Sequence, residues 1–133
     1  MKNNLDLTIL KGLALPIVAP TKIPKNLAVR RVQAKPDSPQ GDAYEIEWTS
    51  DDAELKLMAA STLEAKRSDP QDPIEFDHRF FGECLLQRTG EELVSDWFSE
   101  MQDGYPAYSV VARGLEPEEV IDFVRSLDYV RVN

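Results

Sequence analysis

The alternation of apolar and polar residues between Tyr44 and Thr49 is the feature that most constrains the fold of this chain. Along this segment Tyr44, Ile46 and Trp48 are separated by polar residues. A period of two predicts a β-strand with one buried face and one face in water. After the turn formers at positions 51 and 52, Leu55 and Leu57 repeat the pattern. The two segments are therefore predicted to pair as a hairpin.

Further strands are predicted wherever apolar or β-branched runs lie between turn formers. Gly82, the pair Thr89 and Gly90, and the pair Asp103 and Gly104 supply the breaks. In the run that begins at Leu93, the simple alternation places Leu93 and Trp97 on one face and Val94 and Phe98 on the other. The predicted strands are Ala28–Ala34, Ile74–Phe80, Cys84–Gln87, Leu93–Ser99, Tyr108–Ala112 and a short terminal one at Tyr129–Val132.

The remaining N-terminal and connecting segments are predicted to be less regular. Leu5–Leu10 fits a short helix packed on the domain or, equally, a strand. The prolines within Leu13–Leu27 restrict that segment to extended or turn geometry. Lys35–Asp42 and Glu64–Pro73 are loops by composition.

A C-terminal helix has the clearest start signal in the chain. Glu116 occupies the N-cap position, Pro117 the first helical position, and Glu118 and Glu119 complement the positive end of the helix dipole. One stripe at helical spacing is apolar and is expected to pack on the sheet. The members of this stripe are Val120, Ile121, Phe123, Val124 and Leu127.

Together these elements predict one α+β domain over residues 1–133, built from an antiparallel sheet and a C-terminal amphipathic helix. A length of 133 residues suits a single domain. The net charge of -9 disfavours nucleic acid and anionic membrane surfaces. A weak basic cluster at Lys22, Lys25, Arg30, Arg31 and Lys35 fits a solvated strand edge.

Compartment is predicted from the cysteine count and from the N-terminal residues. Cys84 is the lone cysteine, so no intramolecular disulfide forms, which favours a reducing compartment. Asp6 and Lys11 interrupt any signal-peptide core, and the apolar run 12–19 is shorter than the roughly 20 residues that span a bilayer. A cytoplasmic protein without a membrane span is expected.

No catalytic, metal-binding or phosphate-binding motif is apparent in the sequence, and no cofactor is expected. His78 is the single histidine, and Cys84 follows six residues later. A Cys–His pair needs hydrogen-bond contact and a third orienting group, and nothing in the local sequence supplies them. His78 shares a predicted face with Phe76 and Phe80, so a partly buried structural histidine is the preferred interpretation.

Large aromatic residues are more numerous than one face of a small sheet needs to bury. They are either covered on both faces by protein or form an exposed patch that meets a partner. The candidate binding residues are Trp97, Phe98, Tyr105 and Tyr108.

The order of short motifs resembles a bacterial domain of unknown function that follows the membrane helix of anti-sigma-factor-like proteins. Leu15–Pro24 is similar to its "LP-x-x-x-P-x-x-LP" opening, and the run from Trp97 through Gly104 and Gly114 to Leu127 is similar to its close. The resemblance implies an α+β fold with a curved antiparallel sheet, in the style of lipoprotein-carrier-like domains, and a sensing or binding role. It transfers no catalytic residues, and this chain departs from the family in showing no membrane helix.

Three functional hypotheses follow from the sequence. The first is a non-enzymatic domain that recognises a protein or an apolar ligand through one sheet face. The second is a small enzyme that uses His78 with nearby carboxylates or Cys84. The third is a structural protein that forms homodimers through an exposed strand edge.

Overall fold

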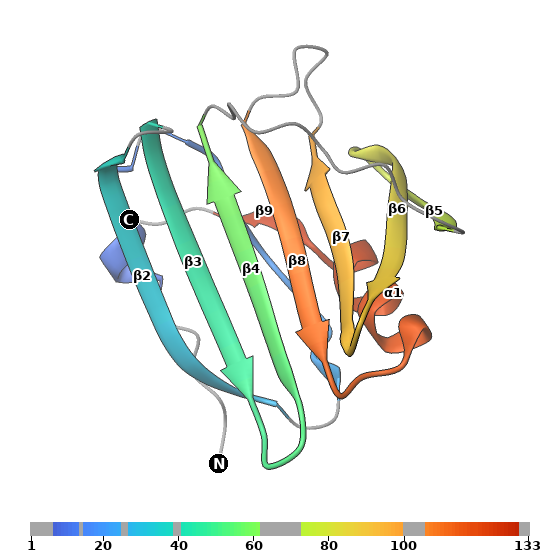
Figure 1. The fold of residues 1–133 in the computed structure, drawn as a ribbon. Coiled ribbons are helices and arrows are strands. Elements are labelled where there is room, and N and C mark those ends of the chain that lie inside the picture. The colour runs from blue at the N-terminus through green and yellow to red at the C-terminus, as the bar shows by residue number, and fades with distance from the viewer. Residues whose placement is uncertain are drawn as a thin grey trace.

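A computed structural model describes residues 7–13, 15–24, 27–38, 41–61, 73–99 and 106–130. Over these ranges the chain forms a seven-stranded antiparallel sheet, a separate pair of short strands and one α-helix (Figure 1). The sheet strands are β2 (Ala28–Ser38), β3 (Gly41–Thr49), β4 (Glu54–Ala60), β5 (Ile74–His78), β6 (Gly82–Thr89), β7 (Glu92–Phe98) and β8 (Ala107–Arg113). Their spatial order is β2-β3-β4-β8-β7-β6-β5, and the sheet is not closed.

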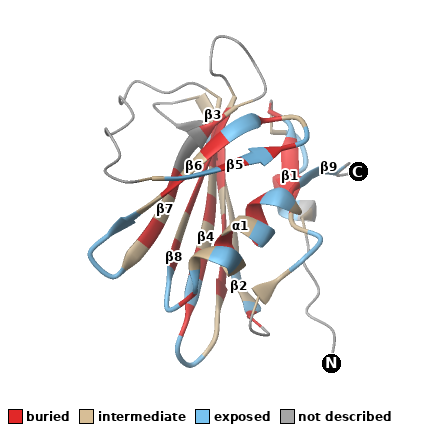
Figure 2. Cartoon of the chain, turned by 90° about the vertical axis from the view of Figure 1, so that its right-hand side faces the viewer, coloured by how far each residue is buried: buried red, intermediate tan, exposed pale blue. Residues whose placement is uncertain are grey.

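The second layer covers one face of this sheet, which we call the inner face. It contains α1 (Pro117–Arg125) and the antiparallel pair β1 (Ile17–Ala19) and β9 (Asp128–Val130). Figure 2 shows this layer on one side of the sheet, with the buried residues between the two. The opposite, outer face of the sheet is turned toward the viewer in Figure 1.

The predicted hairpin is confirmed, with Trp48 opposite Leu55 and Ile46 opposite Leu57 across β3 and β4. Each of these side chains is buried, whereas Glu45 and Glu47 are partly exposed on the outer face. The edge of the Trp48 ring lies against Phe123 of α1, with ring centroids 5.2 Å apart. The alternation in β3 therefore decides which side of the sheet receives the helix.

The helix begins as its sequence predicts. Glu116 is the N-cap, and its backbone N–H donates to Glu119 Oε1 at 2.9 Å. This reciprocal contact satisfies a donor that the helix itself leaves open. Val120, Phe123 and Val124 are buried against the sheet, so the predicted packing of the helix is confirmed.

Two N-terminal predictions differ from the structure. The expected short N-terminal helix is not shown, because residues 7–13 contain only the 3₁₀ turn η1 (Thr8–Leu10). The predicted loop Lys35–Asp42 is largely strand, since β2 continues to Ser38 and β3 begins at Gly41. Pro36 is tolerated there because β2 is an edge strand with a register irregularity at this point.

A buried hydroxyl in β7 has no hydrogen-bond partner among the described residues. Ser95 is fully buried, and its Oγ makes no hydrogen bond within the described structure. An unpaired polar group in a core is destabilising because it loses its hydrogen bonds to water. We therefore expect Ser95→Ala to raise the free energy of unfolding by roughly 1 kcal/mol in a urea titration. A loss of stability instead would show that the hydroxyl has a partner in solution.

Candidate functional site

Two of the four predicted aromatic binding residues, Phe98 and Tyr108, are described by the structure and lie in the core. Phe98 and Tyr108 are 3% and 0% exposed, and their rings pack around Phe81 at centroid distances of 4.9 and 5.3 Å. The Tyr108 hydroxyl donates to the Pro16 carbonyl at 2.9 Å, just before β1. These two side chains therefore present no surface to a partner.

The other two predicted aromatic residues are not placed in this way. Tyr105 lies outside the described residues, as does the predicted turn at Asp103 and Gly104, and the side chain of Trp97 is likewise not described. The simple alternation fails in β7 because the register shifts between Ser95 and Phe98. This bulge puts Phe98 on the same buried face as Leu93, although the alternation assigned the two to opposite faces.

His78 is buried and fully engaged with backbone groups, as the preferred interpretation of the sequence holds. Its Nε2 lies 3.0 Å from the carbonyl oxygen of Leu127, and its Nδ1 accepts from the N–H groups of Phe80 and Phe81 at 3.2 and 3.3 Å. A carbonyl only accepts and an amide N–H only donates, so the proton is fixed on Nε2. The imidazole joins the turn after β5 to the segment between α1 and β9.

His78 and Cys84 do not have the geometry of a catalytic pair. Both ring nitrogens of His78 are occupied by backbone groups, which leaves none to activate a thiol. Cys84 is buried, and its Sγ lies 3.7 Å from the Gly82 carbonyl oxygen. It stands opposite Phe76 in the β5–β6 register, while His78 stands opposite Gly82.

The pKa of His78 is lowered, and burial of the imidazole is the largest cause. The nearby Arg79 guanidinium lowers it further, whereas the Leu127 carbonyl and Asp128 act in the opposite direction. Arg79 and Asp128 themselves form an ion pair at 2.8 Å. The neutral ring is favoured in the folded state because a proton on Nδ1 would face two N–H donors.

This arrangement predicts a pH dependence of stability. Since the folded pKa lies below the unfolded value of about 6.5, the unfolded chain binds the extra proton first as the pH falls. The contribution of the neutral His78 to the free energy of unfolding is complete above the pKa of the unfolded chain. It is lost as the pH falls through the lower pKa of the folded protein. Urea titrations should therefore show a decline in the free energy of unfolding below about pH 6.5. His78→Gln should remove this part of the decline, and an unchanged profile in the variant would contradict the assignment.

The described residues contain neither a grouping suited to a metal ion nor a helix suited to a membrane span. No three His, Cys, Asp or Glu side chains in this part of the chain are grouped so as to hold a metal ion. Likewise, the described residues include no helix with the length and apolar character needed to cross a bilayer.

The outer face of the sheet carries a groove of about 330 Å³. Because paired strands align their residues, its floor is built from cross-strand rows. In the central row Arg31 of β2 is opposite Glu47 of β3, which is opposite Lys56 of β4. The row ends within the groove at Val111 of β8, which is opposite Lys56. We call this hollow the outer-face groove.

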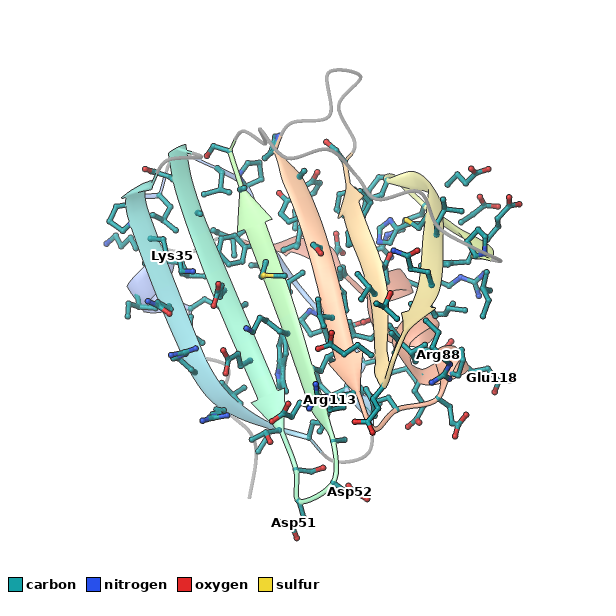
Figure 3. The ribbon with its side chains drawn as sticks, viewed as in Figure 1. Lys35, Asp51, Asp52, Arg88, Arg113 and Glu118 are labelled. Atoms are coloured by element: carbon teal, nitrogen blue, oxygen red, sulfur yellow. The ribbon has the colours of Figure 1, made fainter. Side chains whose placement is uncertain are left out.

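A second row borders the outer-face groove nearer the β3–β4 turn. Here Glu54 of β4 is opposite Arg113 of β8, which is opposite Glu92 of β7. Figure 3 labels Arg113 near the C-terminal end of β8. Met58 of β4 also lines the groove, so the lining mixes charged and apolar side chains.

Positive charge is in local excess at the outer-face groove. Its lining has the four basic residues Arg30, Arg31, Lys56 and Arg113 against the three acidic residues Glu47, Glu54 and Glu92. The lining is thus net +1, whereas the whole chain has a net charge of -9. The basic members come from three separate strands, β2, β4 and β8.

Glu47 organises the basic side chains at the centre of the outer-face groove. Its carboxylate contacts Arg31 Nη2 at 2.5 Å and Lys56 Nζ at 3.7 Å. The hydrogen bond from Arg31 is the largest cause of a lowered pKa at Glu47, so this carboxyl stays ionised. One carboxylate is therefore shared by two cations, which leaves a surplus of positive charge.

Sequence reasoning missed this site, although it had singled out Arg30 and Arg31 within the basic cluster near the N-terminus. Arg31 and Lys35 do pair with Glu47 and Glu45 of β3, as a solvated strand edge would. What the sequence does not display is the register that brings Lys56 and Arg113 to the same face. Comparisons with family models, curated proteins and solved structures found no match to this chain. Function is therefore argued from the geometry of the described residues.

Proposed function

We propose that this chain is a non-enzymatic binding domain that recognises a partner protein through the outer-face groove. The observation that carries the proposal is a groove of about 330 Å³ whose lining is net basic on a strongly acidic chain. The inner face is covered by α1, β1 and β9, whereas the groove lies on the opposite, outer face of the sheet. The motif resemblance at Leu15–Pro24 implies a role of the same class.

The alternative functions have less support in the structure. An enzyme built on His78 would need a free ring nitrogen, and both nitrogens are bonded to the backbone. Homodimers formed through a sheet edge would need an edge that accepts another strand. The edge strand β2 carries Pro36 and a register shift at Arg30, and the edge strand β5 carries the exposed acids Glu75 and Asp77. Such features discourage edge pairing.

We place the domain in the cytoplasm. Cys84 is the single cysteine of the sequence, and it is buried and in no disulfide, which suits a reducing compartment.

The proposal is tested by neutralising two basic residues in the groove. The groove variant combines Lys56→Gln with Arg113→Gln. The control variant combines Lys22→Gln with Arg88→Gln, which removes the same two charges elsewhere. Lys22 forms an exposed ion pair with Asp122 of α1. Arg88 is two residues after the buried Leu86 along β6, so its side chain lies on the inner-face side of the sheet. Figure 3 labels Arg88 at the margin of the sheet.

Tagged wild-type protein and both variants are incubated with an extract of the native host, and recovered proteins are quantified by mass spectrometry. We expect a stoichiometric partner to be recovered about tenfold less by the groove variant and equally by the control variant. Thermal unfolding of each variant confirms that the fold is intact. Equal recovery of every partner by the two variants would overturn the proposal.

A further inference from the structure

We propose that the occupant of the outer-face groove is an extended acidic peptide segment of the partner protein. This inference rests on the proposed function and names the chemistry that the groove recognises. The segment runs across the strands, with its carboxylates on the basic side chains of β2 and β8 and an apolar side chain between them.

The dimensions of the groove fit a short extended segment. Its lining extends from β2 through β3, β4 and β8 to β7, which is four strand spacings. At about 4.8 Å per spacing the groove is roughly 19 Å long, the length of about six extended residues. A helix of the same length would need about 13 residues, and its diameter of about 10 Å suits a deeper trough than an open sheet face.

The basic side chains are available to an incoming anion. The side chains of Arg31 and Arg113 are 54% and 55% exposed and that of Lys56 is 40% exposed, whereas Glu47 is 13% exposed. Glu47 therefore lies below Arg31 and Lys56 and holds them without covering their outer donors. Arg113 instead pairs with Glu92 at 3.6 Å, and more than half of its side chain stays exposed. Arginine in this setting can still offer paired N–H groups to a second carboxylate.

The apolar members of the lining select a mixed sequence rather than a purely acidic one. Val111 is opposite Lys56 in the central row, and Met58 is two residues further along β4. Both are half-buried, and a methionine thioether adapts to irregular apolar side chains. An apolar residue of the peptide has contacts here that a run of carboxylates would lack.

Local and overall charge act in opposite directions on such a ligand. The net charge of -9 repels an acidic peptide at long range, but salt screens this repulsion beyond about 8 Å at physiological ionic strength. Contacts between the peptide carboxylates and the groove cations are shorter than this screening length. Recognition is thus governed by the groove lining at working salt concentrations.

The probe is the acetylated and amidated hexapeptide Glu-Ser-Leu-Ser-Glu-Ser. Alternate residues of an extended chain point to one side, so both glutamates and the leucine face the sheet together. The two glutamates lie about 13 Å apart, close to the roughly 14 Å of three strand spacings that separate β2 from β8. The matched control replaces both glutamates of the peptide with glutamine.

Binding is measured by isothermal titration calorimetry at 150 mM salt, on the order of physiological ionic strength. We expect the acidic peptide to bind at least about tenfold more tightly than the glutamine peptide. The Lys56→Gln and Arg113→Gln variant should lose about tenfold in affinity for the acidic peptide, and the Lys22→Gln and Arg88→Gln control should stay within about twofold.

The outcomes separate this inference from the proposed function. Equal binding of the acidic and glutamine peptides, or no binding of the acidic one at about 1 mM, would overturn the acidic-peptide inference and leave the groove proposal standing. Tight binding of the acidic peptide that both protein variants retain would place the peptide site elsewhere and overturn the inference, whereas the groove proposal is overturned by equal recovery of the partner protein by the two variants.

Discussion

Replacing Gly114 with alanine is expected to lower the free energy of unfolding by roughly 3 kcal/mol or more, from the left-handed backbone and the clash together. Gly114 follows β8 with φ at +78°, and a Cβ there would lie 2.2 Å from the carbonyl oxygen of Asp52. The obstacle is backbone of the β3–β4 turn, which cannot rotate aside as a side chain would. The turn and the end of β8 must therefore separate beside Arg113.

Gly90→Ala is the matched control for this prediction. Gly90 also has a positive φ, of +63°, but a Cβ built on it meets nothing within 4 Å. Its cost should be limited to the backbone conformation, about 1 kcal/mol. Urea titrations of both variants measure the difference, and equal losses would contradict the close approach of Gly114 to Asp52.

Replacing Trp48 with alanine is expected to lower the free energy of unfolding by about 3–5 kcal/mol. Trp48 is 2% exposed, and its ring meets that of Phe123 nearly edge-on at 5.2 Å. The alanine variant leaves a cavity between sheet and helix and removes this contact. Since a domain of this size is stable by about 5–15 kcal/mol, the variant should unfold at markedly lower urea concentration.

The milder variant Trp48→Phe keeps an aromatic ring in the same cavity. It should retain part of the contact with Phe123 and lose clearly less stability than the alanine variant. Similar losses in the two variants would mean that the ring contact contributes little and that the helix is held by its other buried residues.

The hairpin of β3 and β4 and the helix α1 were both predictable because their signals are local. Alternation around Trp48 and the capping pattern around Glu116 each depend on a few neighbouring residues. The buried role of His78 was also predictable from its apolar neighbours on the strand. Its bond to Leu127, 49 residues away in the chain, was not.

Features set by pairing between distant strands could not be predicted from the sequence. The bulge before Phe98 reverses the expected face, and nothing in the local sequence marks it. Pro36 predicts a loop when the sequence is considered alone, whereas an edge strand tolerates a proline. That β2 is an edge strand depends on the order of the whole sheet. The outer-face groove is a further case, since Arg31, Lys56 and Arg113 meet only through the registers of three strand pairs.

Site-specific cross-linking in host cells shows whether a partner protein docks on the outer face. A photoactivatable phenylalanine analogue is placed at Met58, in the groove, or at Ile9, which is 58% exposed outside the groove. After illumination in host cells, we expect a discrete covalent adduct from position 58 and none of the same mass from position 9. The adduct should weaken when Lys56→Gln and Arg113→Gln are also present. An adduct from position 9 with none from position 58 would contradict docking on the outer face.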